Sequence, residues 1–478
     1  MLSTDEIITL INDDKTSEKK QFARIGLKYY EGEHDILNYK IYYYDGDGIL
    51  QEDKFKSNIR ISHPFFTELV DQQVQYMLSG IDNPIRSDLP ELQTELDNYF
   101  DDDFYSELYE LLTGAVSKGF EYMYAVSGED GKTRFECADS LGVVEVRAKD
   151  TDDGCEYIIF WYIDRIDKGK KKITRVQVWD KENIYFYVSA REGELVLDEA
   201  AEINPRPHTI YTDKKGRQSG KGFGFIPFFR LDNGKKQFSG LKPIKALIDD
   251  YDLMACSLSN NLQDFTDAIY VVTGFQGDDI SQMIQNIKVK KAIGVDDGGT
   301  VDIRTIDIPY QARQTKLDLD EKNIYRFGMG FNSAQIGDGN ITNVVIKSRY
   351  ALLDLKCNKL EIRLKQFLRK LIQIVLDEIN KANETDYRQK DVYFKFEREV
   401  MTNASDNALI EKTDAEKQQV QINTILSLAN VLDDETIVQS ICDILDISYE
   451  DIKGKITIDE EKDTAQAITQ LKRTDVNE

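Results

Sequence analysis

The sequence predicts an α+β protein, because strand-like and helix-like segments occupy different parts of the chain. Short runs rich in Val, Ile, Tyr and Phe are concentrated between residues 120 and 240, whereas apolar residues recur every three or four positions after residue 241. The first pattern is typical of strands and the second of helices. The chain has 478 residues, 41% hydrophobic and 31% charged, so it can bury sizeable cores and should hold two or more domains.

The part before residue 120 is predicted to be mainly helical. A polar helix is expected over residues 17–30, and YKIYYYDGDGIL then predicts a strand that enters a turn at residues 45–48. The next helix is expected over residues 64–80, since Pro suits a first helical position and Gly a helix end. Further helix is expected over residues 91–119. The predicted apolar face of the helix that begins at Pro64 consists of Phe66, Leu69, Val70, Val74, Met77 and Leu78.

A sheet is predicted next, because short β-rich runs are separated by Gly, Asp and Lys turns. This sheet-bearing region should close near GFGFIPFFRLDNG. The runs are FEYMYAVSG, GVVEVRA, EYIIFWYID, KITRVQVWD and NIYFYVS.

After residue 241 the pattern becomes helical. At 1.5 Å per residue, a helix of about 26 residues would span roughly 40 Å. Residues 270–308 then predict a small αβ insert: a strand, a short helix and a hairpin whose turn is Asp296–Gly299. A second helix after Pro309 has only a thin apolar stripe, which is typical of a helix with water on most sides. The apolar stripe of the first helix is Ile244, Leu247, Tyr251, Met254, Leu258, Leu262 and Phe265.

A Gly/Asn/Asp loop at residues 332–342 precedes the longest predicted helix. Apolar residues step by four and three without a break, which predicts about 36 residues of helix, roughly 54 Å long. The chain then predicts one strand, DVYFKFEREV, and a small helical cluster after residue 403. The repeating apolar positions of the long helix are Ile346, Tyr350, Leu353, Cys357, Leu360, Leu364, Phe367, Leu371 and Ile374.

Composition excludes several classes of protein. The formal net charge of −25 argues against tight binding to nucleic acid or anionic lipid, because such binders carry a basic excess. No run approaches the roughly 18 consecutive apolar residues that a membrane span needs. The N-terminus, MLSTDEIITLINDD, lacks the basic-then-apolar order of a signal peptide, so a cytoplasmic protein is expected. The 5 cysteines contain no CxxC pair and indicate neither a disulfide framework nor a zinc site.

No motif predicts a catalytic, cofactor-binding or metal-binding residue. GRQSGKGFG has the wrong spacing for a phosphate-binding loop, and Gly222 stands where Ser or Thr should hold magnesium. DGDG and DDGG lack the remaining ligands of a calcium loop. The 3 histidines, at positions 34, 63 and 208, are too scattered to predict a metal or triad site. Acidic pairs could hold two metal ions, but 86 acidic residues produce such clusters by chance.

At this point the sequence resembles the portal proteins of tailed bacteriophages, particularly those from phages and prophages of Gram-positive bacteria. None of the matching stretches is a catalytic signature, so their order and spacing together carry the resemblance. They are YYEGEHDIL, NIRISHPFFTELVDQQVQYMLSG, IPFFRLDNGKKQFSGLKPIKALIDDYDLMACSLSNNLQDFTDAIYVVTGF and GDGNITNVVIKSRYALLDLKCNKLE.

The resemblance implies a ring, typically of twelve subunits, at one capsid vertex, through which double-stranded DNA is packaged and ejected. It also implies that the protein is not an enzyme, since a separate terminase docks on the clip and head-completion or tail proteins dock later. The implied parts are an N-terminal segment and wing (1–240), stem helices (241–269 and 309–331), a clip (270–308), a tunnel loop (332–342), a long supporting helix (343–380), a wing return strand (381–402) and a crown with C-terminal tail (403–478).

The resemblance assigns residues to these parts. The tunnel loop would meet DNA weakly, because glycines let its backbone change shape and short polar side chains contact phosphates. Basic residues near the channel could form a phosphate-facing ring or equally pair with neighbouring acids, and the clip lysines could dock terminase or equally cover a solvated hairpin. The loop residues are Asn332, Ser333, Gln335, Ile336, Gly337, Asp338, Gly339, Asn340 and Thr342; the channel candidates are Arg313, Lys316, Lys347 and Arg349; the clip candidates are Lys288, Lys290 and Lys291.

The expected partners are other copies of the chain, duplex DNA in transit, terminase, head-completion or adaptor proteins, and the major capsid and scaffolding proteins, with no cofactor and no membrane. The expected location is the virion, with the host cytoplasm during assembly. Two alternatives stay open: a phage structural or adaptor protein that forms no conduit, and a metal-dependent nuclease of a mobile element.

Overall fold

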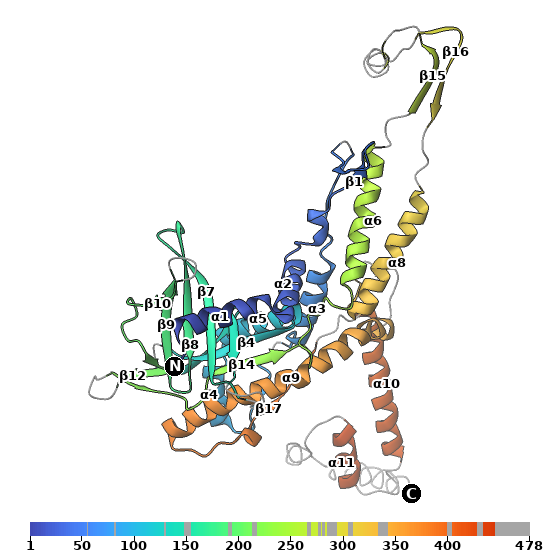
Figure 1. The fold of residues 1–478 in the computed structure, drawn as a ribbon. Coiled ribbons are helices and arrows are strands. Elements are labelled where there is room, and N and C mark those ends of the chain that lie inside the picture. Colours follow the sequence, from blue (N-terminus) through green and yellow to red (C-terminus); the bar gives the residue numbers. More distant parts are fainter. Residues whose placement is uncertain are drawn as a thin grey trace, which may run out of the picture. The chain divides into compact units, whose positions relative to one another are not determined.

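The computed structural model of the chain is shown in Figure 1. The chain divides into two compact units, one comprising Met1–Ile336 and Arg349–Glu399, the other Gly337–Ser348 and Val400–Glu478. Both helices and sheets are present, so the predicted α+β class is confirmed. The structure describes residues 1–54, 56–80, 83–128, 131–147, 154–189, 194–212, 218–264, 269–275, 279, 283, 294–304, 309–332, 343–398, 404–427 and 434–444.

Two short helices open the first unit and share one capping residue. Helix α1 (Thr4–Thr16) ends at Ser17, whose side chain accepts a hydrogen bond from Lys20 N and so also begins α2 (Glu18–Tyr30). A serine hydroxyl satisfies one of the backbone N–H groups that the first turn of a helix leaves without a partner. Helix α2 confirms the prediction for residues 17–30, whereas α1 was not predicted. A 3-10 turn, η1 (Asp35–Asn38), follows.

The β1–β2 hairpin and helix α3 also agree with the predictions. Strands β1 (Tyr42–Tyr44) and β2 (Leu50–Glu52) pair across the predicted turn. Helix α3 (Phe65–Met77) buries the predicted face apart from the half-buried Leu78. Pro64 stands at the N-cap, one residue before the predicted position. Strand β3 (Ile85–Arg86) and helices α4 (Pro90–Tyr99) and α5 (Asp102–Lys118) follow.

All five predicted strands between residues 120 and 189 are present, and they belong to two antiparallel sheets. Strand β5 (Thr133–Ala138) was not predicted. The three-stranded sheet has the order β14-β4-β5, with β4 (Phe120–Ser127) and β14 (Phe228–Asp232). The six-stranded sheet has the order β10-β9-β8-β7-β6, with β11 beside β9; its strands are β6 (Val143–Val146), β7 (Tyr157–Ile166), β8 (Lys171–Trp179), β9 (Asn183–Ser189), β10 (Val196–Leu197) and β11 (Arg206–Pro207). Strands β12 (Thr209–Thr212) and β13 (Gln218–Lys221) form a separate pair.

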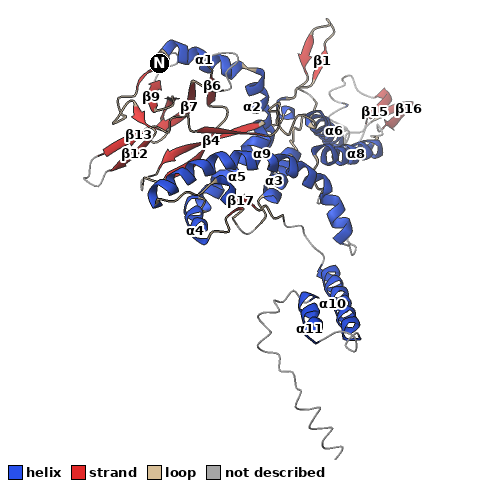
Figure 2. Ribbon diagram, turned by 90° about the horizontal axis from the view of Figure 1, so that it is seen from below, coloured by secondary structure: helices blue, strands red, loops and turns tan. Residues whose placement is uncertain are grey.

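The first unit is layered around these two sheets. One core cluster contains Tyr122 of β4, Phe160 of β7 and Trp179 of β8, so the two sheets pack face to face. The opposite face of the six-stranded sheet packs against Ile7 and Ile11 of α1. Figure 2 shows α5 and α9 on the side of β4 that faces away from β6, β7 and β9. Because successive strand residues point to opposite faces, each sheet can contribute to the cores on both of its sides.

Two helices and a strand pair follow the sheets. Helices α6 (Lys245–Asp264) and α8 (Tyr310–Gly328) confirm the helical predictions and lie side by side (Figure 1). Strands β15 (Ile269–Phe275) and β16 (Val295–Arg304) pair between them in sequence. The predicted hairpin turn at Asp296–Gly299 is wrong, since these residues lie within β16, where the register of pairing with β15 shifts. Four turn-forming residues in a row also suit such an irregularity.

The long helix is longer than predicted. Helix α9 runs over Asn343–Asn383, 41 residues. A 3-10 turn, η4 (Gln389–Asp391), and strand β17 (Tyr393–Phe394) follow, and β17 pairs with β3. The strand predicted over residues 391–399 is therefore reduced to two residues. In the second unit, α10 (Ala404–Ser427) and α11 (Asp434–Ile444) confirm a C-terminal helical cluster.

Candidate functional site

The paired helices α6 and α8 form a rod whose interface contains carboxylates. On α6 the buried residues are Ile248, Asp252 and Cys256, one turn apart. This stripe lies beside most of the predicted one. The predicted Ile244, just before α6, is buried, Leu247, Tyr251, Met254 and Leu258 are half-buried, Leu262 is exposed, and Phe265 lies outside the described residues. On α8, Leu317, Asp320 and Ile324 are buried. A buried carboxylate is costly unless it is paired, so each one must have a partner.

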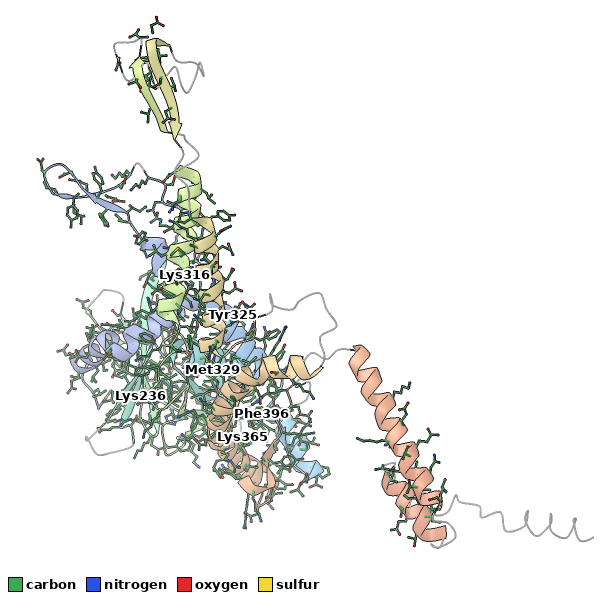
Figure 3. All side chains as sticks on the ribbon, turned by 90° about the vertical axis from the view of Figure 1, so that its right-hand side faces the viewer. Lys236, Lys316, Tyr325, Met329, Lys365 and Phe396 are labelled. Carbon is green, nitrogen blue, oxygen red and sulfur yellow. The ribbon has the colours of Figure 1, made fainter. Side chains whose placement is uncertain are left out.

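Lys316 pairs with acids of both helices. Its Nζ lies 2.5 Å from Asp250 Oδ2 on α6 and also contacts Asp320 on α8. Figure 3 labels Lys316 on the rod. Desolvation lowers the pKa of Lys316, but the hydrogen bonds that its ammonium donates to Asp250 and Asp320 outweigh this effect, so the pKa is raised. Arg313 lies beside α6 as well: with the Asn261 amide turned so that its oxygen faces the guanidinium, this oxygen accepts from the two terminal nitrogens of Arg313 at 2.6 and 2.7 Å. Both residues thus connect the two helices of the rod. Lys316 pairs with acids, which is one of the two roles that the sequence left open for it, whereas Arg313 contacts an amide. Their exposure to a channel stays a prediction.

Asp252 is one of the residues that join α6 to the N-terminal part of the chain. Its Oδ2 accepts from His34 Nδ1 at 2.6 Å, and its Oδ1 lies 2.7 Å from His63 Nδ1 and 3.0 Å from the His63 backbone N. The imidazole of His34 stacks on Tyr29, 4.4 Å between ring centroids. Desolvation opposes ionisation of Asp252, yet these hydrogen bonds lower its pKa below the ordinary value. No sequence signal could unite these residues, because they come from three separate segments.

Two of the three histidines therefore meet, although the sequence predicted no metal or triad site from them. Both rings direct Nδ1 at the same carboxylate, so Asp252 is shared between His34 and His63. Within the part of the chain that the structure describes, no group of three or more His, Cys, Asp or Glu side chains could hold a metal ion. The arrangement is that of a structural junction between α6 and the N-terminal helices.

The chain leaves α8 through a tight connection to α3. Met329 adopts a left-handed conformation and caps α8. The Gln72 side chain accepts from Phe331 N at 3.0 Å and donates to Phe331 O at 2.7 Å. Asn332 Nδ2 donates to Glu321 Oε1 at 2.8 Å. Of the predicted tunnel-loop residues only Asn332 is described; Ser333, Gln335, Ile336, Gly337, Asp338, Gly339, Asn340 and Thr342 lie outside the described residues.

The other predicted basic residues belong to α9 and to the predicted clip. Lys347 is exposed on α9, and Arg349 is half-buried and makes contacts of its own. The predicted clip residues Lys288, Lys290 and Lys291 lie outside the described residues. The structure thus places Arg313 and Lys316 on one rod. The roles of the remaining basic residues in DNA contact or docking stay predictions.

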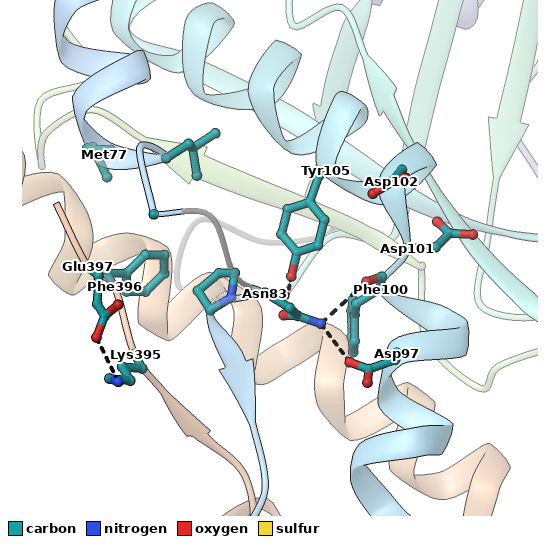
Figure 4. A pocket seen from close by; sticks show the side chains of 13 residues that line it. Met77, Asn83, Asp97, Phe100, Asp101, Asp102, Tyr105, Lys395, Phe396 and Glu397 are labelled. Carbon is teal, nitrogen blue, oxygen red and sulfur yellow. Dashed lines mark hydrogen bonds and ion pairs between the residues drawn. The ribbon is translucent and has the colours of Figure 1, made fainter. Parts of the chain in front are cut away.

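A pocket at the C-terminal end of α3 carries no catalytic arrangement. It has a volume of about 550 Å³ and is lined by residues of α3, α4 and α5 and by the segment after β17 (Figure 4). Tyr105 donates to Asn83, which donates to Asp97 Oδ1 at 3.1 Å. Burial raises the pKa of Tyr105, so its hydroxyl stays protonated. Lys395 lies 2.7 Å from Glu397. The polar groups of this pocket therefore pair mainly with one another, and none forms a nucleophile with a base.

Comparison with known proteins decides what the rod and the long helix belong to. Residues 10–466 match the family described as "Phage portal protein, SPP1 Gp6-like". The chain belongs to this family of phage portal proteins. It is 27% identical over 384 residues to the portal protein of Bacillus phage SPP1, covering 80% of this chain and 75% of that protein. It is 26% identical over 408 residues to the portal protein of Clostridium phage phiCD119, covering 78% of this chain and 84% of that protein.

Membership gives the fold its context. A portal function follows from the family match, and the resemblance to phage portal proteins stated from the sequence is confirmed. The portal proteins are a structural family. Among the residues that the structure describes, no helix is both long and apolar enough to cross a membrane.

Proposed function

We propose that copies of this chain assemble into a ring, typically of twelve subunits, that sits at one vertex of the phage capsid and conducts double-stranded DNA. The observation that carries the proposal is the family match over residues 10–466, which includes the rod, the segment 332–342 and the whole long helix. In this arrangement α6 and α8 are the stem and residues 332–342 form the tunnel loop. A cyclic ring follows from head-to-tail contacts between identical subunits when the rotation closes.

The charge of the chain supports passage of DNA rather than tight binding. The net charge of −25 repels a polyanion, and proteins that hold DNA firmly release counterions through many Lys and Arg contacts. The ion pairs of Lys316 remove one further cation from the set that could grip phosphate. A duplex that is held weakly can move, as transit requires.

Docking of terminase, and later of head-completion or tail proteins, is proposed for residues 270–308. A solvent-facing β15–β16 pair supports this, with Val271 and Val301 exposed at 43% and 41%. Exposed apolar side chains on a strand pair suit a protein contact. The lysines at positions 288, 290 and 291 would supply charge there.

Electron microscopy of the purified protein tests the ring. The expected result is a particle with cyclic symmetry and a central hole wide enough for duplex DNA. Particles of cyclic symmetry without a hole would favour a non-conduit adaptor, and a monomer under all assembly conditions would exclude the portal ring. The nuclease alternative is tested by incubation with plasmid and Mg²⁺ or Mn²⁺; cleavage that an acid-pair substitution abolishes would replace the conduit proposal with an enzyme.

A further inference from the structure

We infer that helix α3 gathers the three passages of the chain between the two compact units and couples them through Tyr76. The passages lie between Ile336 and Gly337, between Ser348 and Arg349, and between Glu399 and Val400. A residue close to each passage is bound to α3 or to a ring that α3 carries. The relevance of this coupling to DNA transit rests on the proposed function, whereas the contacts themselves do not.

The first passage is preceded by Phe331, whose backbone is held by α3. The N–H of Phe331 donates to the Gln72 amide oxygen, and its carbonyl accepts from the Gln72 amide nitrogen. The Gln72 side chain thus makes the two hydrogen bonds that a neighbouring strand would make. Gly330 approaches α3 closely, and a Cβ at this position would lie 2.0 Å from a methyl carbon of Leu69. The exit of α8 therefore cannot shift unless α3 or its side chains shift with it.

The second passage is followed by Tyr350 on α9. Its ring stacks on Phe331, with centroids 4.8 Å apart and planes inclined by 20°. It also meets Tyr76 of α3, with centroids 5.5 Å apart. Tyr350 thus joins the two ends of the segment between residues 331 and 350 and connects both to α3. Aromatic pairs in such geometry contribute beyond simple burial.

The third passage is preceded by Arg398, whose guanidinium carbon lies 5.8 Å from the Tyr76 ring centroid. Arg398 also pairs with Asp354, at 2.5 Å, and with Glu361 on α9, and its side chain is 10% exposed. The guanidinium is therefore fixed between α9 and the face of Tyr76. A cation held over an aromatic ring and shielded from water is attracted to it.

Phe331, Tyr350, Tyr76 and Arg398 form one continuous series of contacts, which we call the aromatic ladder. Tyr76 is 9% exposed and lies between Tyr350 and Arg398. Packed rings have few alternative arrangements, so a displacement at one passage requires the others to repack. The four residues are positioning residues: they act on the segments that connect the units.

Hydrogen exchange of the full-length protein tests the coupling with Tyr76→Ala. Because one aromatic pair is worth about 0.5–1.5 kcal/mol, exchange should rise roughly two- to tenfold at residues 329–332, 343–348 and 404–410 together. Tyr76→Phe keeps the ring, and Leu355→Ala removes an exposed side chain of α9 (55% exposed), so both should exchange like the parent protein.

The pattern of exchange decides the outcome. A rise confined to one of the three segments, or absent from residues 404–410, would overturn the inference. The four residues would then contribute to core packing without coupling the segments. If Tyr76→Ala does not fold, Tyr350→Leu is judged by the same three segments. Imaging of rings tests the conduit proposal separately from hydrogen exchange. Failure of the conduit proposal can therefore be distinguished from failure of the coupling.

Discussion

At the scale of single residues, the charge of a buried ionic group depends on the partners that the fold places around it. Glu121 is 2% exposed and contacts Lys118, while its Oε1 accepts from Ser140 N at 2.5 Å. Desolvation raises the pKa of Glu121 to about 7 against the opposing charge of Lys118. Asp252, by contrast, receives enough hydrogen bonds to have a lowered pKa. The difference shows that the partners of a buried acid, as well as its burial, decide its charge.

The space around Glu121 makes Gly114 a sensitive position. A Cβ on Gly114 would lie 1.9 Å from Glu121 Oε2. Gly114→Ala should therefore destabilise the fold by about 1–3 kcal/mol, although Ala is the better helix former. Chemical denaturation measures the change. In a double-mutant cycle with Glu121→Ala the cost should fall, and equal costs in both backgrounds would show that the carboxylate is not the obstacle.

Asp252 should make the free energy of unfolding depend on pH in the acidic range. Its folded pKa is lowered, so its contribution is complete above the ordinary Asp pKa of about 3.9 and is lost as the pH falls through the folded value. Asp252→Asn should cost about 2–3 kcal/mol at pH 7, since hydrogen bonds to a charged acceptor are lost. Unfolding curves between pH 7 and pH 3 should show the difference between the two proteins shrinking below about pH 4. A difference that is constant over this range would contradict the role given to the carboxylate.

At the scale of elements, the rod is held by a mixed interface of apolar and ionic residues. Leu317 and Ile324 are buried apolar residues of α8, while Asp320 is 3% exposed and depends on Lys316 for a counter-charge. An isolated pair of exposed charges contributes little, but a cation that neutralises a buried acid contributes more. The packing of α8 against α6 therefore depends on Lys316, a residue that the sequence analysis considered for contact with DNA.

Lys316→Ala should loosen the rod. It leaves Asp320 buried without its cation, so unfolding should become easier by about 1–2 kcal/mol and amide exchange in α6 and α8 should rise. Lys322 on the same helix is exposed, and Lys322→Ala should stay within about 0.5 kcal/mol of the parent protein. Equal effects of the two substitutions would contradict the assigned role of Lys316.

At the scale of the whole molecule, the proposed conduit requires a pliable contact with DNA on a stiff support. Helix α9 has 41 residues and packs in the first unit through Leu353, Cys357, Leu360 and Leu364, all at most 1% exposed. These positions were predicted from the spacing of apolar residues, and their burial confirms them. A long helix fixed along one side is a stiff element, and glycines in the preceding segment permit changes of backbone conformation.

Removal of Gln335–Asn340 tests this division of roles. Rings should still form, because the deletion spares the described elements of both units, whereas the yield of DNA-filled particles should fall. Electron microscopy counts rings and filled particles in one experiment. A deletion of the same length at residues 473–478 is the control. Unchanged yields of filled particles would count against a role of this segment in packaging or retention.

Sequence alone determined most helices and strands, because apolar periodicity and turn residues act over a few neighbouring positions. It also carried the family, through the order of motifs along the chain. It failed where local signals were weak or ambiguous: the polar α1, the short β5, and the four turn-forming residues that lie inside β16.

Tertiary structure alone decided which side chains meet. The periodicity of α6 allowed two neighbouring stripes, and the packing of η1 and α3 selected the one that contains Asp252. Likewise, Arg313 and Lys316 are indistinguishable in sequence from free surface cations until α6 lies beside α8. The physical reason is that ion pairs and aromatic stacks depend on distances across the fold, and one sequence position carries no information about a partner more than 200 residues away.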